Sequence, residues 1–375
     1  MLRRVLITAG GTGGHVYPAL AVAEALHEHC PETEQYFVGS AGGFERNLIQ
    51  KSGLTFASFD EVQAGPVHGI NPLKALVSGG KLIIGTGQAF GILRRHKPEA
   101  ILSTGGWASL PIALAAWFLR IPLVIYLPDI EPGLTIKTLR PFSRKICVTT
   151  AESAPFFRAD QMVVTGYPLR EQVLTANREQ GIAHFKLDTS RQTLLVFGGS
   201  LGSRNVNIAL IDTLPELLKR PVQIIHVTGN TDYERSQEQV RALKIDTTHY
   251  HDFAYLHGDM GLAFAAADMA LCRSGASILG ELPYFGLVGI LVPYPYAWRY
   301  QKVNADYMAK QQAAIAMEDA SMERDLLPTL LDLLDHPAKL AEMKANAAAL
   351  AQPQAAWKIA QILIATADPG KAKSA

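Results

Sequence analysis

A short apolar run that ends in a glycine-rich turn occurs twice in this chain. In the first copy Val5–Thr8 leads into Gly10–Gly14, and in the second Leu194–Phe197 leads into Gly198–Gly202. Both turns read Gly-Gly-hydroxyl-x-Gly, and a helical pattern follows each of them. This order of buried strand, tight turn and helix is typical of nucleotide-binding βαβ units. Two widely separated copies predict two similar Rossmann-like domains rather than one enlarged domain.

The rest of the chain alternates short β-branched runs with longer amphipathic stretches, which predicts an α/β fold with parallel sheets. The predicted strands are Val5–Thr8, Tyr36–Val38, Ala100–Ser103, Leu123–Tyr126, Ile146–Thr149, Leu194–Phe197, Ile224–Thr228, Met269–Cys272 and Gly289–Val292. The predicted helices include Pro18–Glu28, Pro111–Leu119, Asn205–Lys219 and Asn304–Gln312. A turn at Thr165–Pro168 interrupts the pattern and places a domain boundary near Gly166–Leu169.

Composition and charge narrow the function classes. The 375 residues carry 35 Lys and Arg against 34 Asp and Glu, so a net charge of +1 gives no overall attraction to nucleic acid. Cys30, Cys147 and Cys272 are too widely spaced for a disulfide framework or a Cys-x-x-Cys metal site, and they fit a reducing cytosol. The N-terminal apolar run is too short for a signal peptide, and no apolar stretch reaches the roughly 20 residues that span a bilayer. We therefore expect a soluble intracellular protein.

The glycine turns are candidate anion sites, because they let a ligand approach the backbone N–H groups at a helix start. The alternative is that the glycines only close tight turns. A nicotinamide or flavin site is disfavoured, since the strand Gln35–Val38 is followed by Gly39 and Ser40 without a carboxylate for a ribose.

His15 directly follows the first turn. An imidazole there can act as an acid or base near neutral pH, because its ordinary pKa is about 6.5. The alternative is a helix-start histidine bonded to backbone. Thr12 is either a turn hydroxyl or a donor to a substrate.

A second candidate site lies between Cys272 and Glu281, where an apolar strand ends in Arg273-Ser274-Gly275 and a helix follows. Arg273 and the backbone N–H groups suit a phosphate, and Glu281 suits the two hydroxyls of a ribose. Alternatively, Glu281 only complements the helix dipole. Farther on, Gln301 and Asn304 share one helical face after an aromatic loop, which suits either a sugar or packing between domains.

Together these motifs resemble the MurG family of bacterial glycosyltransferases, which add N-acetylglucosamine to the lipid-linked muramyl-pentapeptide precursor of peptidoglycan. The matching segments stand in family order over nearly the whole chain: Gly10–Pro18, Ser103–Ser109, Gly166–Arg170, Gly198–Ser203, Cys272–Ala276 with Glu281, and Gln301 with Asn304. The resemblance implies a GT-B fold with two Rossmann-like domains facing a cleft. It implies an acceptor- and membrane-facing domain over 1–166, a UDP-sugar domain over 167–350, and a C-terminal helix with a frayed tail over 351–375 that returns to the first domain.

The resemblance also implies the donor, UDP-N-acetylglucosamine, and a set of site residues. The donor-side set is Gly199 and Ser200 at the diphosphate, Ala276 in the motif after the strand, Glu281 at the ribose, Leu256 at the uracil, Gln301 with Asn304 at the sugar, and Arg170 from the linker side. The acceptor-side set is Thr12, Gly13 and Gly14.

The implied chemistry is a displacement with inversion, in which the acceptor 4-hydroxyl attacks the anomeric carbon while a base takes its proton. His15 is the candidate base. The family uses no metal or cofactor, which agrees with the lack of a D-x-D motif in this chain. Backbone dipoles and cationic side chains would stabilise the leaving UDP.

The chain departs from the family at two places. The family commonly carries His-Glu-Gln-Asn where this chain has Tyr126–Asp129, and often Asn where it has Tyr167. An ionised Asp129 only accepts hydrogen bonds, so it cannot replace the donor bonds of the amide, but it can act as the base. The departures leave two alternatives open: a GT-B transferase with another acceptor, and a catalytically silent protein that binds a nucleotide sugar.

A lipid-linked acceptor also implies peripheral contact with the cytoplasmic face of the plasma membrane. Leu73–Arg95 and Trp117–Arg120 combine apolar residues with Lys and Arg, as binding to anionic lipid requires. The alternative is a core helix with solvated basic ends.

Overall fold

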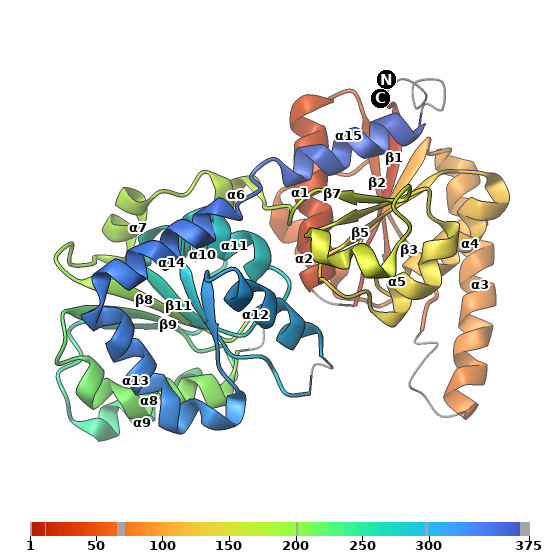
Figure 1. Ribbon diagram of the computed structural model, residues 1–375. Helices are drawn as coiled ribbons and strands as arrows, with labels where there is room; N and C mark the ends of the chain where they lie inside the picture. The colour runs from red at the N-terminus through yellow and green to blue at the C-terminus, as the bar shows by residue number, and fades with distance from the viewer. Residues whose placement is uncertain (1, 12, 66–71, 200–201, 297–298, 368–375) are drawn as a thin grey trace. The chain divides into compact units, whose positions relative to one another are not determined.

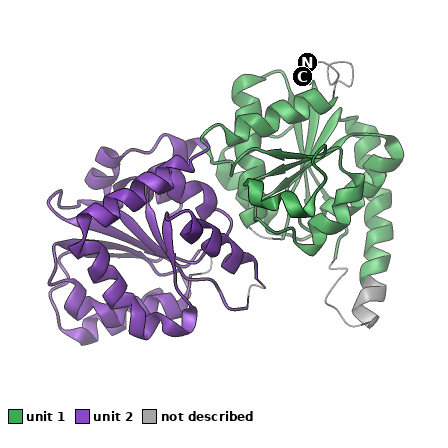
Figure 2. Ribbon diagram, viewed as in Figure 1, with its two compact units in different colours: residues 1–170, 353–375 green, residues 171–352 purple. Residues whose placement is uncertain are grey.

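The computed structural model describes residues 2–11, 13–65, 72–199, 202–296 and 299–367, with the backbone alone described for 72–77. The chain forms two compact units (Figure 2). Unit 1 comprises residues 1–170 and 353–375, and unit 2 comprises residues 171–352. Each unit is built on a parallel sheet flanked by helices (Figure 1). We describe the two units separately.

Unit 1 carries a parallel sheet with the strand order β3-β2-β1-β4-β5-β6-β7. Its strands are β1 (Arg4–Thr8), β2 (Glu34–Ser40), β3 (Ser58–Val62), β4 (Ala100–Ser103), β5 (Leu123–Leu127), β6 (Lys145–Val148) and β7 (Met162–Val164). Its helices are α1 (Gly13–His29), α2 (Glu45–Ser52), α3 (Pro72–His96), α4 (Ser109–Leu119), α5 (Leu134–Leu139), the short 3-10 helices η1 (Arg140–Phe142) and η2 (Ala151–Phe156), and α15 (Ala355–Ala367).

Unit 2 carries a parallel sheet with the order β10-β9-β8-β11-β12-β13. Its strands are β8 (Gln192–Phe197), β9 (Val222–Val227), β10 (Tyr250–Phe253), β11 (Met269–Cys272), β12 (Val288–Leu291) and β13 (Ala314–Ala316). Its helices are α6 (Glu171–Leu174), α7 (Arg178–Phe185), α8 (Arg204–Leu217), α9 (Tyr233–Leu243), α10 (Met260–Ala266), α11 (Ile278–Phe285), α12 (Tyr300–Lys310), η3 (Asp319–Ser321), α13 (Met322–Asp335) and α14 (Pro337–Ala349).

The two sheets share one topology. In each, the chain starts at a central strand, moves outward on one side, and then crosses back to continue on the other side. The crossing point lies between β1 and β4 in unit 1 and between β8 and β11 in unit 2. The last residues of these strand pairs are register partners, Thr8 with Ser103 and Phe197 with Cys272. The predicted pair of Rossmann-like sheets is confirmed.

The predicted strands are all present, with ends shifted by at most a residue or two, but four further strands were not predicted. These are β3, β7, β10 and β13, and each is an outer strand of its sheet. Outer strands have one neighbour and carry half-exposed residues, so they lack the continuous apolar run of a buried parallel strand. An apolar-run criterion therefore finds only the central strands.

The predicted helices are present with different bounds. Helix α1 begins at Gly13 rather than at Pro18, and it accommodates Pro18 in its interior. The helix therefore starts directly at the glycine turn and holds His15 in its first turn. Helix α12 begins earlier than predicted, at Tyr300, and ends before Gln312, whose φ of 55° is left-handed.

The C-terminal helix α15 packs against α1 within unit 1 (Figure 1). Ala356 meets Ala21 and Ala25, and small side chains of this kind let two helix backbones approach closely. The Trp357 ring lies 4.2 Å from that of His29.

Candidate active site

In open α/β sheets, ligands bind beyond the carboxyl ends of the strands, where the strand order reverses. In unit 1 this place is formed by the segments that follow β1, β4 and β5, and in unit 2 by those that follow β8, β11 and β12. Among the described residues singled out in the sequence, Gly13, Gly14 and His15 come after β1, Asp129 after β5, Gly199 after β8, and Ala276 after β11.

The first glycine turn is held by close backbone packing. A Cβ atom on Gly106, after β4, would lie 2.3 Å from the Gly10 carbonyl oxygen, and Gly106 has a φ of 87°. Both observations require glycine, because an L side chain fits neither the space nor the backbone conformation. The segments after β1 and β4 therefore touch through their main chains.

Glu45, at the start of α2, supports the same turn and was not identified from the sequence. Its side chain is buried, and its Oε1 accepts a hydrogen bond of 3.2 Å from the Gly11 N–H. The N–H of Gly11 is thus already engaged inside the protein. Glu45 lies 34 residues beyond Gly11 in the chain, so no local sequence pattern indicates this contact.

His15 is half-buried in the first turn of α1, and two contacts with the segment after β4 fix it. The Thr104 hydroxyl donates to the His15 carbonyl oxygen at 2.7 Å. The imidazole lies over Gly105, where an added Cβ would come within 3.1 Å of Cδ2 and 3.2 Å of Nε2. Gly105 thereby leaves room for the ring.

The electrostatics of His15 suit a base. Burial lowers its pKa below the ordinary value of 6.5, while the charge of Asp129 and a hydrogen bond with the Gly10 backbone oppose that shift. The imidazole is therefore neutral at pH 7 and able to accept a proton. Asp129 follows β5, so the interaction joins the ends of two strands of one sheet.

The residues at which the chain departs from the family pattern differ in burial. Tyr126 is completely buried in β5, and Tyr167 is buried beside it, with the rings edge to face at 6.3 Å. Asp129, by contrast, is half-buried next to His15. The tyrosines thus form a packed pair in the core, and Asp129 alone of the departures interacts electrostatically with His15.

The other unit 1 residues of the predicted set have mixed positions. Gly13 and Gly14 open α1, and Gly14 is exposed. The Arg170 guanidinium lies 4.7 Å from the ring centre of Tyr17, so it stacks on α1. Thr12 lies outside the described residues.

In unit 2 the glycine turn after β8 is also held by backbone packing. A Cβ atom on Gly202 would lie 2.4 Å from the Thr228 carbonyl oxygen, and Gly199 is exposed with a φ of 86°. Ser203 ends the turn and precedes α8. Ser200 lies outside the described residues.

Arg273 braces this turn from within. Its side chain is only 8% exposed, its Nε donates to the Ser203 hydroxyl at 2.9 Å, and it pairs with the Asp319 carboxylate at 2.5 Å. The sequence suggested Arg273 as a phosphate ligand, but its charge is matched inside the protein. Asp319 lies in η3, 46 residues farther along the chain, so no local sequence pattern indicates this pairing.

The loop after β11 is fastened to α12. Asn304 is completely buried, and its Nδ2 donates to the Ser274 carbonyl oxygen at 3.1 Å. Asn304 thus holds the loop after β11, and its contact with substrate stays a prediction. Gln301 is half-buried, and its Oε1 accepts a hydrogen bond from the Tyr294 N–H at 2.8 Å.

The remaining donor-side residues lie at the strand ends of unit 2. Ala276 and Glu281 are half-buried beside β11, and Leu256 is buried after β10. Burial is the larger cause of the raised pKa of the Cys272 thiol, and the negative charge of Glu281 raises it further. Glu281 therefore lies near the carboxyl end of β11, as a ribose-binding carboxylate requires.

A buried polar network underlies the start of α8. His226 in β9 contacts Tyr250 Oη at 2.7 Å through Nδ1 and Asn207 Oδ1 at 3.0 Å through Nε2. Asn207 also donates to Asp232 at 3.1 Å. Burial lowers the pKa of His226 to about 3, so this imidazole stays neutral.

No group of three or more His, Cys, Asp or Glu side chains in the described part of the chain is arranged to hold a metal ion. None of the helices described is long and apolar enough to cross a membrane.

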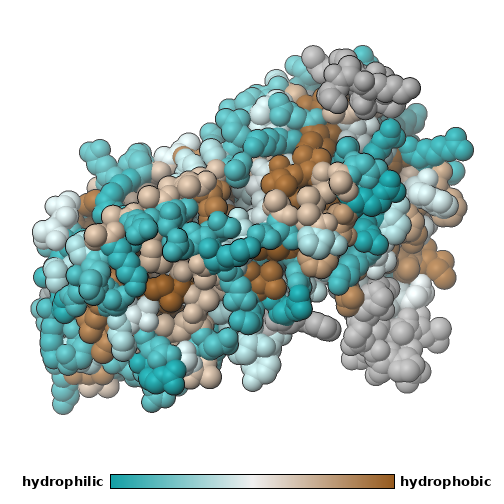
Figure 3. Space-filling model, in the orientation of Figure 1, coloured by the Kyte–Doolittle hydropathy of each residue, from teal (hydrophilic) through white to brown (hydrophobic). Residues whose placement is uncertain are grey.

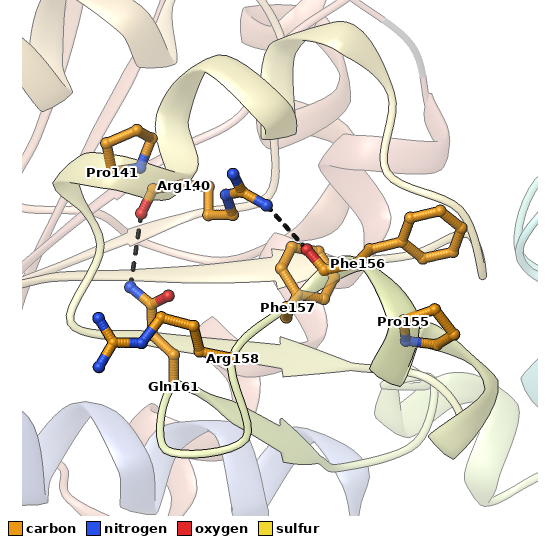
Figure 4. Close-up of a pocket in the computed structure, with 7 residues that line it drawn as sticks. All are labelled: Arg140, Pro141, Pro155, Phe156, Phe157, Arg158 and Gln161. Carbon is orange, nitrogen blue, oxygen red and sulfur yellow. Dashed lines mark hydrogen bonds between the residues drawn. The ribbon is translucent and has the colours of Figure 1, made fainter.

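A cavity of about 440 Å³ lies elsewhere in unit 1, beside η1, η2 and β7 (Figure 4). Its arginines are already bonded. Arg140 donates to the Phe156 carbonyl oxygen at 2.9 Å, and Arg158 pairs with Asp160 at 2.7 Å. The cavity contains none of the predicted site residues.

Comparison with known proteins agrees with this architecture. The glycosyltransferase family 28 N-terminal domain matches residues 5–148, and the family's C-terminal domain matches residues 193–359. The crystal structure of MurG from Acinetobacter baumannii has a TM-score of 0.77 at 26% identity, over 96% of this chain and 99% of that one. UDP-GlcNAc 2-epimerase from Neisseria meningitidis shares the fold at a TM-score of 0.68, with 13% identity over 96% and 99% of the two chains.

Two curated relatives are similar over nearly their full length. Both are UDP-N-acetylglucosamine–N-acetylmuramyl-(pentapeptide) pyrophosphoryl-undecaprenol N-acetylglucosamine transferases. The protein from Moorella thermoacetica is 37% identical, covering 98% of this chain and all of the relative. The protein from Roseiflexus sp. is also 37% identical, covering 96% and 94% of the two chains. With its two domains, its GT-B fold and this full-length similarity, the chain belongs to the MurG family of glycosyltransferases.

Proposed function

We propose that this protein transfers N-acetylglucosamine from UDP-N-acetylglucosamine to the lipid-linked muramyl-pentapeptide precursor of peptidoglycan, with inversion at the anomeric carbon. The observation that carries the proposal is the full-length similarity to transferases named for this reaction. The geometry at the strand ends supports it, because both units present glycine turns and unit 1 presents a neutral imidazole.

His15 is the proposed base. It takes the proton from the acceptor 4-hydroxyl as that oxygen attacks the anomeric carbon, and the bond to UDP breaks. The nearby Asp129 carboxylate stabilises the imidazolium that forms. No metal or cofactor is part of this proposal.

In unit 2, Gly199, Ser200 and Ala276 are proposed to face the UDP diphosphate, Leu256 to border the uracil, and Glu281 to bind the ribose hydroxyls. Gln301 is proposed to contact the sugar, while Asn304 and Arg273 hold the loops that present these groups. In unit 1, Thr12, Gly13, Gly14 and Arg170 are proposed to complete the sugar and acceptor side.

A different acceptor is the second candidate function, and Asp129 is the observation that favours it. An ionised carboxylate in place of the family's amide cannot donate a hydrogen bond to substrate. The tyrosines Tyr126 and Tyr167 give this alternative no support, because both are buried in the core.

The protein is also proposed to bind the cytoplasmic face of the plasma membrane peripherally. Two exposed apolar pairs support this: Ile83 and Ile84 on α3, and Trp117 and Phe118 on α4. Helices α3 and α4 pack together, and hydrophobic residues gather on that side of unit 1 (Figure 3). Ile92 and Leu93, which the sequence grouped with this surface, belong to the core instead.

The direct test is transfer of labelled N-acetylglucosamine from its UDP donor to a short-chain lipid-linked muramyl-pentapeptide, with EDTA present. We expect product from the wild type and a loss of roughly 10²–10⁴-fold in His15→Ala, the usual contribution of a general base. UDP binding, measured in parallel by calorimetry, should weaken in Glu281→Ala and persist in His15→Ala. UDP binding without product would move the search to another acceptor, and UDP binding without transfer to any acceptor would indicate a silent binding protein.

A further inference from the structure

Buried hydroxyls hold the carbonyl groups of the two residues next to Asp129 in the chain, Pro128 and Ile130. Thr149 Oγ1 donates to the Pro128 carbonyl oxygen at 2.7 Å, and Ser153 Oγ donates to the Ile130 carbonyl oxygen at 2.7 Å. Both hydroxyl residues are buried. They come from one short segment, in which Thr149 follows β6 and Ser153 lies in η2.

Tyr126 extends this arrangement. Its hydroxyl lies 2.9 Å from Thr149 Oγ1, and its side chain is completely buried. The single Thr149 proton is directed at the carbonyl oxygens of Pro128, at 2.7 Å, and Leu127, at 3.2 Å, so Tyr126 is the donor to Thr149. Burial raises the pKa of Tyr126 well above its ordinary value, so the phenol keeps this proton.

These hydrogen bonds lie beyond the end of β5, where the chain has left the sheet. Strand β5 ends at Leu127, so the carbonyls of Pro128 and Ile130 lie beyond the strand. The Pro128 carbonyl belongs to the peptide plane directly before Asp129, and the Ile130 carbonyl belongs to the plane between Ile130 and Glu131. Holding the chain at these two points restricts the direction of the Asp129 Cα–Cβ bond, because each peptide plane is rigid. A side chain held in this way keeps its position relative to a partner on another strand.

We propose that Tyr126, Thr149 and Ser153 form a hydroxyl clamp that positions the Asp129 carboxylate for its interaction with His15. The clamp acts through Asp129, so its members are positioning residues and touch no substrate. The inference rests on the proposed function, in which Asp129 stabilises the protonated base. It also gives the family departure at Tyr126 a role, since the Tyr126 hydroxyl supplies the hydrogen bond to Thr149.

The chain offers a matched control for this proposal. Thr150, the next residue, also has a buried hydroxyl, and its Oγ1 has no hydrogen-bond partner among the described residues. Thr149→Val and Thr150→Val therefore make the same chemical change one residue apart. Only Thr149→Val removes a hydrogen bond that the structure shows. Thr149→Ser keeps the hydroxyl and is the conservative rescue.

The kinetic experiment compares kcat and KM for both substrates in these variants, in Ser153→Ala and in Tyr126→Phe. We expect Thr149→Val and Ser153→Ala to lower kcat about tenfold each, since small misplacements of catalytic groups cost up to 10²-fold. KM for the UDP donor should stay unchanged. Thr150→Val should retain full kcat, and Thr149→Ser should restore it.

A double-mutant cycle then separates the clamp from general destabilisation. In an Asp129→Asn background, Thr149→Val should cause no further loss of kcat, because the group it positions is gone. Two results would contradict the clamp and leave the proposed function intact. One is that the losses of kcat multiply in the double variant, and the other is that Thr149→Val keeps full kcat while Asp129→Asn is impaired.

A second readout needs no acceptor. Titration of the His15 ring by NMR should show a lower pKa in Asp129→Asn, because the attraction that raises it is lost. The clamp variants should shift His15 in the same direction, and Thr150→Val should not. Unmoved values in Thr149→Val and Ser153→Ala would refute the clamp even if the acceptor proves to be a different molecule.

Discussion

At the His15 imidazole, burial and charge act in opposite directions on the same proton. Burial favours the neutral ring, whereas Asp129 and the Gly10 backbone favour the charged one, and burial dominates. The result is a base that is unprotonated at pH 7 but sits beside a carboxylate able to stabilise it once protonated. Gly105 contributes by having no side chain where the ring lies.

This balance predicts the acid side of the pH profile. Since burial lowers the pKa of His15 below its ordinary value, the acid-side decline of kcat/KM should begin at a lower pH than an ordinary imidazole would give. In Asp129→Asn the maximal rate should be lower, and the decline should begin at a still lower pH, because the charge that raises the pKa of His15 is lost. Initial rates at saturating UDP donor and low acceptor measure this limb. A decline beginning above pH 7 in the wild type would contradict the assignment of His15 as the base.

At the scale of elements, loops that follow the strands of unit 2 are held by hydrogen bonds and an ion pair to residues distant in the chain. Arg273 joins the turn after β8 to η3 through Ser203 and Asp319, and Asn304 joins the loop after β11 to α12. The network around His226 anchors the first turn of α8 in the same way. Arg273, Asn304 and His226 each have hydrogen-bond partners, which offsets the desolvation cost of burying them.

His226 makes this network sensitive to acid. Its pKa is about 3 in the folded protein and about 6.5 in an unfolded chain, so between these values only the unfolded chain takes up the proton. Through this residue the free energy of unfolding should fall by about 2 kcal/mol from pH 7 to pH 5. It should stop falling below about pH 3, where both states are protonated.

Urea unfolding at pH 7 and pH 5, compared between the wild type and His226→Gln, measures this contribution. The variant should be less stable at pH 7 and should lose less stability on acidification. Replacement of the exposed His336 on unit 2 is the matched control. Equal pH dependence in the wild type and His226→Gln would show that His226 is not the buried titrating group.

At the scale of the whole molecule, two sheets of the same topology carry different chemistry at their strand ends. Unit 1 offers an imidazole and a carboxylate, and unit 2 offers a glycine turn and Glu281. Unit 1 also carries the exposed apolar side chains of α3 and α4, with Lys81, Arg94 and Arg120 exposed on the same elements or directly after them. Apolar side chains with nearby cations suit a membrane that contains anionic lipid.

Vesicle binding tests this surface. The wild type should sediment with phosphatidylglycerol vesicles more than with phosphatidylcholine vesicles, and added salt should weaken the binding. Trp117→Ser together with Ile83→Ser should reduce binding at least about tenfold, because each buried apolar side chain contributes roughly 1.5–3 kcal/mol. Tyr296→Ser, a change at a still more exposed aromatic residue on unit 2, should have no effect. Loss of binding in the Tyr296 variant instead would assign the membrane contact to unit 2.

Much of this protein is readable from its sequence, because the responsible signals are local. The central strands of both sheets appear as continuous apolar runs, and the glycine turns appear as motifs beside them. His15, Glu281 and the family itself follow from residues that stand next to one another in the chain. The outer strands β3, β7, β10 and β13 lack such runs, since one neighbour leaves them half-exposed.

Tertiary structure alone decided which polar residues face a site and which hold it in place. Arg273 and Asn304 read as ligands in the sequence, but each is buried against a partner from another element. Glu45 and the clamp residues Thr149 and Ser153 had no sequence signal, because their partners lie 21 to 34 residues away. Burial and hydrogen bonding depend on what the fold brings together, and residue type and spacing along the chain do not record it.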